Sequence, residues 1–176
     1  MTFERRCVCF GSSRVDAESD AGRLAHECGC VLARAGWTVM TGGYEGVMGA
    51  VSRGARSEGG RVVGVTTPAF SERIPNDALH QEWSEPDYIA RMGTLLRQGH
   101  AFVGLPGGLG TMSEWLAATC LASIGQLAGP VVLFRDPWEP VWETVLRLPE
   151  VGPESGEFVR LVNNPAELLA AVGTAG

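Results

Sequence analysis

The chain has 176 residues, enough for one domain with a sizeable core, and 45% of them are hydrophobic. Its net charge of −6 argues against a broad basic face for nucleic acid, although a small group of arginines could hold a phosphorylated small molecule. No apolar run approaches the ~18–20 residues of a membrane span and no signal peptide is recognisable, so we expect a cytoplasmic protein that does not bind membranes.

Short apolar runs alternate with helical periodicities along the chain. The first strand, 6–10, ends in Gly11, Ser12 and Ser13, and apolar residues at three- and four-residue steps then predict a helix closed by Gly36. Further strands are predicted at 37–40, 61–65, 101–105, 130–134 and 158–162, and further helices at 43–57, 86–98, 112–124, 138–146 and 165–172. Apolar strands separated by helices indicate an α/β fold, with a parallel sheet covered on both faces, over a single domain 1–176.

One segment, 66–85, lacks any periodicity and contains Pro68, Pro75 and Asn76. It is longer than most connections, and long loops of this kind are often lids or binding loops. We expect it to move.

All 14 basic residues are arginine, so the chain contains no lysine. Pyridoxal-phosphate enzymes, P-loop NTPases and class-I aldolases each need a lysine and are excluded. The five cysteines are an odd number in a chain without a signal peptide, which argues against a disulfide framework, and the two Cys-x-Cys pairs are poorly spaced for a metal. We expect Cys7, Cys9, Cys28, Cys30 and Cys120 to be buried thiols, and we expect no metal site.

Ligands of parallel sheets bind beyond the carboxyl ends of the strands. This rule selects three loops rich in glycine and hydroxyl groups: Gly11 to Ser13, Thr41 to Gly43, and Pro106-Gly107-Gly108-Leu109-Gly110-Thr111. The last lies between a strand and a helix, where free backbone N–H groups and the helix dipole favour phosphate, although a plain tight turn is an equal alternative. An NAD site is disfavoured, because the first two strands lack the dinucleotide fingerprint and its acidic residue.

Two side chains near this loop have competing interpretations. Glu114 follows Thr111 by three residues, so it could simply complete a capping box at the start of its own helix. Arg91, on the preceding helix, would by local sequence alone be a solvated surface arginine.

A set of motifs favours functional roles for Arg91 and Glu114 over these structural ones. Arg91 precedes Pro106-Gly-Gly-Leu-Gly-Thr-Met-Ser-Glu114 by fifteen residues, and both follow Gly42-Gly-Tyr-Glu-Gly-Val-Met-Gly49 and Gly11-Ser-Ser13. This arrangement, over about residues 7–134, resembles the LOG ("Lonely Guy") family, which includes cytokinin riboside 5′-monophosphate phosphoribohydrolases and is often mislabelled lysine decarboxylase. The resemblance implies a three-layer Rossmann-like fold and a homodimer.

The resemblance also assigns residues. It implies that Arg91 and Glu114 are catalytic, that Gly107 to Thr111 cradle a phosphate, and that Arg97 matches a second arginine of the same helix. We therefore expect nucleotide binding by Gly11, Ser12, Ser13, Gly42, Gly43, Met92, Pro106, Gly107, Gly108, Leu109, Gly110 and Thr111. The sequence departs from the family at Met92, usually lysine, at Ala117, usually acidic, at Tyr44-Glu45 in the glycine-rich turn, and at 120–125.

The expected reaction is hydrolysis of a purine nucleoside 5′-monophosphate, without a cofactor, to free base and ribose 5-phosphate. A carboxylate such as Glu114 can stabilise the oxocarbenium character of C1′ and activate water, and Arg91 is expected to keep that carboxylate ionised. Met92 and Ala117 leave open an alternative, a non-catalytic binder of a phosphorylated ligand, such as a nucleotide sensor or a molybdenum-cofactor carrier.

Overall fold

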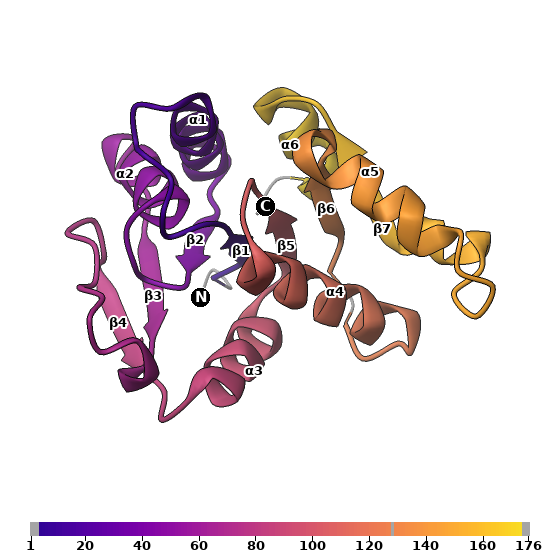
Figure 1. The fold of residues 1–176 in the computed structure, drawn as a ribbon. Coiled ribbons are helices and arrows are strands. Elements are labelled where there is room, and N and C mark those ends of the chain that lie inside the picture. Colours follow the sequence, from indigo (N-terminus) through magenta and orange to yellow (C-terminus); the bar gives the residue numbers. More distant parts are fainter. Residues whose placement is uncertain (1–3, 128, 174–176) are drawn as a thin grey trace.

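The computed structural model describes residues 4–127 and 129–173, which form a seven-stranded parallel sheet between two layers of helices (Figure 1). The strands are β1 (Arg6–Phe10), β2 (Thr38–Thr41), β3 (Val62–Thr66), β4 (Gln81–Ser84), β5 (Ala101–Gly104), β6 (Val131–Phe134) and β7 (Val159–Val162). The helices are α1 (Asp20–Arg34), α2 (Val47–Ser57), α3 (Tyr88–Gln98), α4 (Leu109–Ser123), α5 (Arg135–Leu146) and α6 (Pro165–Val172), with short 3₁₀ turns η1 (Pro68–Phe70) and η2 (Pro153–Phe158).

The inner strands of the sheet are buried on both faces, as a parallel sheet requires, whereas the two edge strands β4 and β7 have exposed residues. Along β1, Cys7 and Cys9 face one core, which α1, α2 and α6 cover, whereas Val8 and Phe10 face a second core, which α3, α4 and α5 cover. The predicted three-layer α/β fold is therefore confirmed.

The strand order is β4-β3-β2-β1-β5-β6-β7, and every pairing is parallel. The chain builds outward from β1 to one edge, then returns to β5 on the other side of β1. The loops that leave the carboxyl ends of β1 and β5 therefore diverge, which creates the crevice where α/β proteins bind ligands.

Strand β4 corrects the prediction for 66–85, which was expected to be irregular throughout. It pairs with β3 at the edge of the sheet, and its sequence, Gln-Glu-Trp-Ser, is largely exposed. A short polar edge strand carries no apolar signal, and such edges are common because they discourage aggregation.

The cysteine prediction is correct in part. Cys7, Cys9 and Cys28 are buried, and burial raises the pKa of the Cys28 thiol. Cys30 is only half-buried, with its Sγ 3.4 Å from Gly54 O of the neighbouring α2, and Cys120 is exposed. Within residues 4–127 and 129–173, no helix is long and apolar enough to cross a membrane.

Candidate functional site

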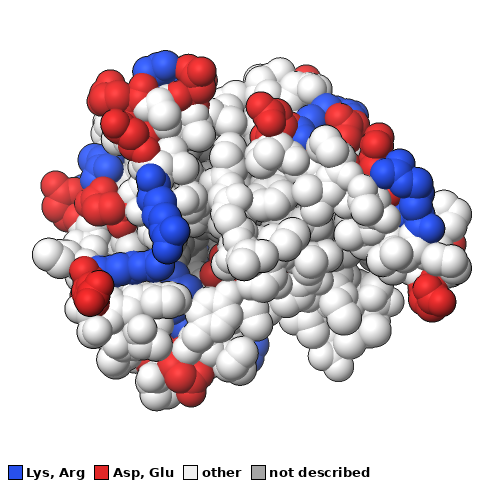
Figure 2. All heavy atoms as spheres, in the orientation of Figure 1, with Lys and Arg blue, Asp and Glu red and all other residues white. Residues whose placement is uncertain are grey.

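A cavity of about 440 Å³ opens between the loops that follow β1 and β5. In the face shown in Figure 2, basic side chains gather around a hollow in the left half, and an acidic group lies inside it. The cavity is lined by Gly11, Ser12, Ser13, Arg14, Met48, Phe70, Arg73, Tyr88, Arg91, Gly108, Leu109, Gly110, Thr111 and Glu114. It is large enough for a small ligand of nucleotide size.

Helix α4 points its N-terminus into this cavity. Gly108 is the N-cap residue and contributes no side-chain cap, and the first intrahelical bond runs from Met112 N to Gly108 O at 2.9 Å. The N–H groups of the first turn are therefore left for a ligand, with the positive end of the helix dipole behind them. A Cβ added at Gly108 or Gly110 would meet nothing within 4 Å, so both glycines face open space.

Glu114 projects from the second turn of α4 into the floor of the cavity. Because the helix begins at Leu109, Thr111 lies inside the first turn and is not the N-cap residue, so the capping-box interpretation of Glu114 is wrong. The carboxyl group is instead 9% exposed, and its Oε1 lies 3.5 Å from Nη1 of Arg91.

Arg91 is buried, not a solvated surface arginine as its local sequence suggests. Its Nε donates to the carbonyl of Val65 at 2.6 Å and its Nη2 to the carbonyl of Gly42 at 2.9 Å. These carbonyls lie at or just beyond the ends of β3 and β2, so the sheet itself fixes the guanidinium beside Glu114.

Burial dominates the electrostatics of this pair. It raises the pKa of Glu114 from 4.5 to about 7, and the charge of Arg91 offsets this only in part. Burial likewise lowers the pKa of Arg91, although a guanidinium stays protonated. Arg91 favours the ionised form of Glu114 as expected, but burial outweighs this effect, so near pH 7 the carboxyl group can hold or release its proton.

Gly42 makes the position of Arg91 possible. A Cβ at residue 42 would overlap Nη2 of Arg91 and would crowd the sulfur of Met48. The next residue, Gly43, has φ of +82°, which lets the chain turn away immediately after β2.

Nine of the predicted site residues meet at the cavity: Arg91, Glu114, Gly11, Ser12, Ser13, Gly108, Leu109, Gly110 and Thr111. The other five lie outside its lining. Gly42 and Gly43 support Arg91 and Asn76 through their carbonyls, and Pro106 accepts a hydrogen bond from Ser12 N at 3.2 Å. Gly107 lies against Thr111, and Met92 packs on the core beneath α3. Arg97, further along α3, is exposed and donates to Thr94 at 3.2 Å.

Five lining residues were not predicted: Arg14, Met48, Phe70, Arg73 and Tyr88. Met48 lies within the glycine-rich motif that follows β2, so this motif could have identified it as a site residue. Phe70 and Arg73 belong to the segment without periodicity, where sequence gives no direction for a side chain. In the part of the chain described, no cluster of His, Cys, Asp and Glu could hold a metal ion.

The chain is similar to proteins of a known family. A family described as "Possible lysine decarboxylase" matches residues 48–172. A cytokinin riboside 5′-monophosphate phosphoribohydrolase of Mycobacterium tuberculosis is 36% identical over 84% of this chain and 83% of its own length. A probable enzyme of the same name from Oryza sativa subsp. japonica is 30% identical over 95% of this chain and 71% of its length. A third relative, from Mycobacterium marinum, is 34% identical over 65% of this chain, but the chain spans only 62% of that relative's length.

Solved structures show the same fold. The molybdenum cofactor binding protein of Rippkaea orientalis has a TM-score of 0.78 at 22% identity, covering 97% of this chain and 96% of that one. The molybdenum cofactor carrier protein of Chlamydomonas reinhardtii has a TM-score of 0.73 at 24% identity, with the same coverage of both chains.

Proposed function

The chain belongs to the LOG family, and from this premise and its buried Arg91–Glu114 pair we propose that it is a nucleoside 5′-monophosphate phosphoribohydrolase. In this proposal it hydrolyses the N-glycosidic bond of AMP or N6-modified AMP to free base and ribose 5-phosphate. The names of its relatives support a glycosidase of this class. Water is the only co-reactant, so the reaction needs no cofactor.

The observation that carries the proposal is a buried carboxyl group with a pKa of about 7 next to a fixed guanidinium, at the floor of a cavity that ends in a helix N-terminus. A phosphate on the first turn of α4 would place the attached ribose over Glu114. As the base leaves, C1′ gains positive charge, which an ionised Glu114 stabilises while it accepts a proton from the attacking water.

Arg91 is the second catalytic residue of the proposal. A guanidinium has five N–H groups, and three of those on Arg91 point to Val65 O, Gly42 O and Glu114. Two remain for ribose or phosphate oxygens. Because its other bonds are to the backbone, Arg91 can orient the sugar without moving itself, which lowers the entropic cost of reaching the transition state.

A non-catalytic binder of a phosphorylated ligand is the second candidate. Its support is the likeness to molybdenum cofactor proteins, which at 22–24% identity concerns the fold alone, together with Met92 and Ala117 at positions where the family usually has lysine and an acidic residue. The intact Arg91–Glu114 pair favours the enzyme.

Base release separates the two candidates. The purified chain is incubated with AMP and with isopentenyl-AMP, and free base and ribose 5-phosphate are measured by chromatography. The enzyme proposal expects both products in equal amounts from at least one nucleotide. Nucleotide binding by calorimetry without any released base would support the binder instead.

We also propose that the chain forms a homodimer. Support comes from the outer side of α4, where Leu109, Cys120 and Ile124 are exposed and continue one apolar stripe with Met112 and Leu116, which are partly buried against the core. Cytoplasmic location and the absence of nucleic-acid or membrane partners remain predictions from composition.

A further inference from the structure

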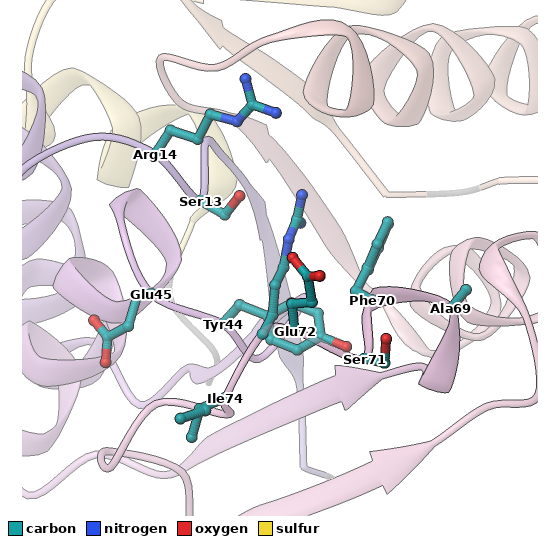
Figure 3. Close-up of a pocket in the computed structure, with 10 residues that line it drawn as sticks. Ser13, Arg14, Tyr44, Glu45, Ala69, Phe70, Ser71, Glu72 and Ile74 are labelled. Atoms are coloured by element: carbon teal, nitrogen blue, oxygen red, sulfur yellow. The ribbon is translucent and has the colours of Figure 1, made fainter.

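A second cavity, of about 660 Å³, adjoins the first, and residues 69–74 of the 67–76 segment line one side of it (Figure 3). The two cavities share Ser13, Arg14, Phe70 and Arg73. Glu114, Arg91 and the first turn of α4 line only the first cavity. Phe70 and Arg73 therefore lie where one cavity leads into the other.

Both ends of the 67–76 segment are tied to the turn after β2. Tyr44 Oη donates to Thr67 O and accepts from Thr67 N, each at 3.0 Å. At the other end, Asn76 Nδ2 donates to Gly43 O and Tyr44 O, each at 3.1 Å. Since Gly42 of the same turn accepts a hydrogen bond from Arg91, the two ends of the segment are anchored next to the residue that positions Arg91.

Arg73 and Arg91 share the same two aromatic rings. The Cζ of Arg73 lies 4.2 Å from the ring centroid of Phe70 and 5.8 Å from that of Tyr44, and the Cζ of Arg91 lies 5.7 Å and 5.6 Å from the same centroids. Cation–π attraction holds the Arg73 guanidinium against Phe70 although the residue is exposed.

All side-chain donors of Arg73 are free in the described part of the chain, whereas three of the five donors of Arg91 already have partners in the protein. Among the described residues, its side chain makes no ion pair and no hydrogen bond, so all five N–H groups are available to a ligand. Its charge also lies close enough to Arg91 to lower the pKa of that residue. Negative charge that develops in a ligand at this place would be stabilised by both guanidinium groups.

We propose that Arg73, held on the ring of Phe70, is a catalytic residue that donates a hydrogen bond to the departing base. This inference rests on the proposed function. With phosphate on α4 and ribose over Glu114, the base extends toward the junction of the cavities, and the second cavity provides space for a substituent on it.

The step balances as a hydrolysis. The bond between C1′ and the base nitrogen breaks, and both of its electrons go to the base, whose developing negative charge Arg73 stabilises. Water forms the new bond to C1′ and gives one proton to Glu114. That proton is finally returned, through solvent, to the released base. Arg73 stays protonated throughout.

The test compares two leaving groups in the same sugar phosphate. AMP has a poor leaving group that needs stabilisation, whereas p-nitrophenyl ribose 5-phosphate releases nitrophenolate, which does not. For Arg73→Ala we expect kcat/KM for AMP to fall by about 10²-fold, the usual effect of one such donor, and that for the nitrophenyl compound by less than about threefold. The melting temperature should not change, because the side chain is exposed.

Arg14→Ala is the matched control. Arg14 is also exposed and also lines both cavities, but it makes no cation–π contact with Phe70 among the described residues. Any loss in Arg14→Ala should be the same factor for both substrates, because it removes only a nearby charge. Phe70→Leu should lower turnover of AMP selectively, as Arg73→Ala does, since it removes the ring that positions the guanidinium.

Two results would overturn the role of Arg73. An equal loss on both substrates would place Arg73 on the phosphate or sugar, and no loss on either would make it a surface residue. Failure of the proposed function looks different, because then the unmutated chain would release neither adenine nor nitrophenolate.

Discussion

At the scale of single residues, Arg91 and Glu114 are held in different ways. Two backbone carbonyls fix Arg91, while the carboxyl group of Glu114 has Arg91 as its partner at 3.5 Å, longer than the 2.7–2.9 Å typical of a charge-assisted hydrogen bond. The guanidinium is thus a rigid reference point and the carboxyl group keeps freedom to shift. This division suits a site in which one group orients the sugar and the other exchanges a proton with water.

The pKa of Glu114 predicts how activity depends on pH. Because its pKa is about 7 and the mechanism needs the carboxylate, kcat/KM should fall about tenfold for each pH unit below roughly 6.5. Glu114→Gln should lose at least ~10²-fold in rate at pH 8 and should not show this acid limb. Rates from pH 5 to 9 check this; turnover of Glu114→Gln equal to that of the unmutated chain would remove Glu114 from the mechanism.

The same pKa predicts how stability depends on pH. The folded chain keeps the Glu114 proton up to about pH 7, whereas the unfolded chain releases it near 4.5, so the folded state binds more protons in between. The free energy of unfolding should therefore fall as pH rises from about 4.5 to 7, by an amount on the order of 3 kcal/mol at most. Urea unfolding at pH 5 and pH 8 measures it, and Glu114→Gln should show a smaller drop than the unmutated chain.

Gly42 offers a test of the guanidinium position in which neither Arg91 nor Glu114 is itself substituted. Gly42→Ala should push Arg91 away from Glu114 and reduce kcat/KM by roughly 10²-fold, close to the loss expected for Arg91→Ala. Gly156→Ala is the control, because the added methyl group would make only an ordinary contact, 3.7 Å from Leu146. Full activity in Gly42→Ala would show that catalysis does not need Arg91 in this position.

At the scale of elements, the N-terminus of α4 is the feature that distinguishes nucleotides from nucleosides. It has no side-chain cap, and two of its glycines face open space, so its donors are satisfied by solvent or by a ligand. A helix capped by its own side chain would gain stability and lose this anion site. The sequence showed the loop and its glycines, but the capping residue depends on where the helix begins, which local sequence defines only to within a few residues.

The N-terminus of α4 predicts that the chain prefers nucleoside 5′-phosphates to nucleosides as substrates. AMP should exceed adenosine in kcat/KM by at least ~10²-fold, because the phosphate bound at α4 contributes the energy that positions the ribose. Gly108→Pro constrains the backbone at the N-cap. It should reduce the ratio of kcat/KM for AMP to kcat/KM for adenosine, because it raises KM for AMP. Equal kcat/KM for AMP and adenosine would mean that the loop is only a turn.

At the scale of the whole molecule, the sequence predicts the helices and strands whose burial follows a regular period. It misses the side chains that loops bring to the site. Apolar runs identify six of the seven strands in the described chain to within two residues, whereas β4 is missed because its residues face solvent. The motifs identify Arg91 and Glu114. They cannot place Arg73 and Phe70, which reach the site only because Tyr44 and Asn76 tie the 67–76 segment to the turn after β2.

The last prediction concerns assembly. Cys120 and Ile124 are exposed on the uncovered side of α4, and Ile124 is 60% exposed, so a charge at either position costs the monomer little. In a homodimer formed through this apolar stripe, the same charges would be buried in the interface, where unpaired charges are strongly unfavourable. Cys120→Glu combined with Ile124→Glu should therefore convert a dimer into monomers, as measured by light scattering after gel filtration.

Leu148→Glu, at an exposed leucine beyond α5, is the control and should leave the mass unchanged. A double variant that remains dimeric would place the interface on another face, and an unmutated chain of monomer mass would contradict the homodimer itself.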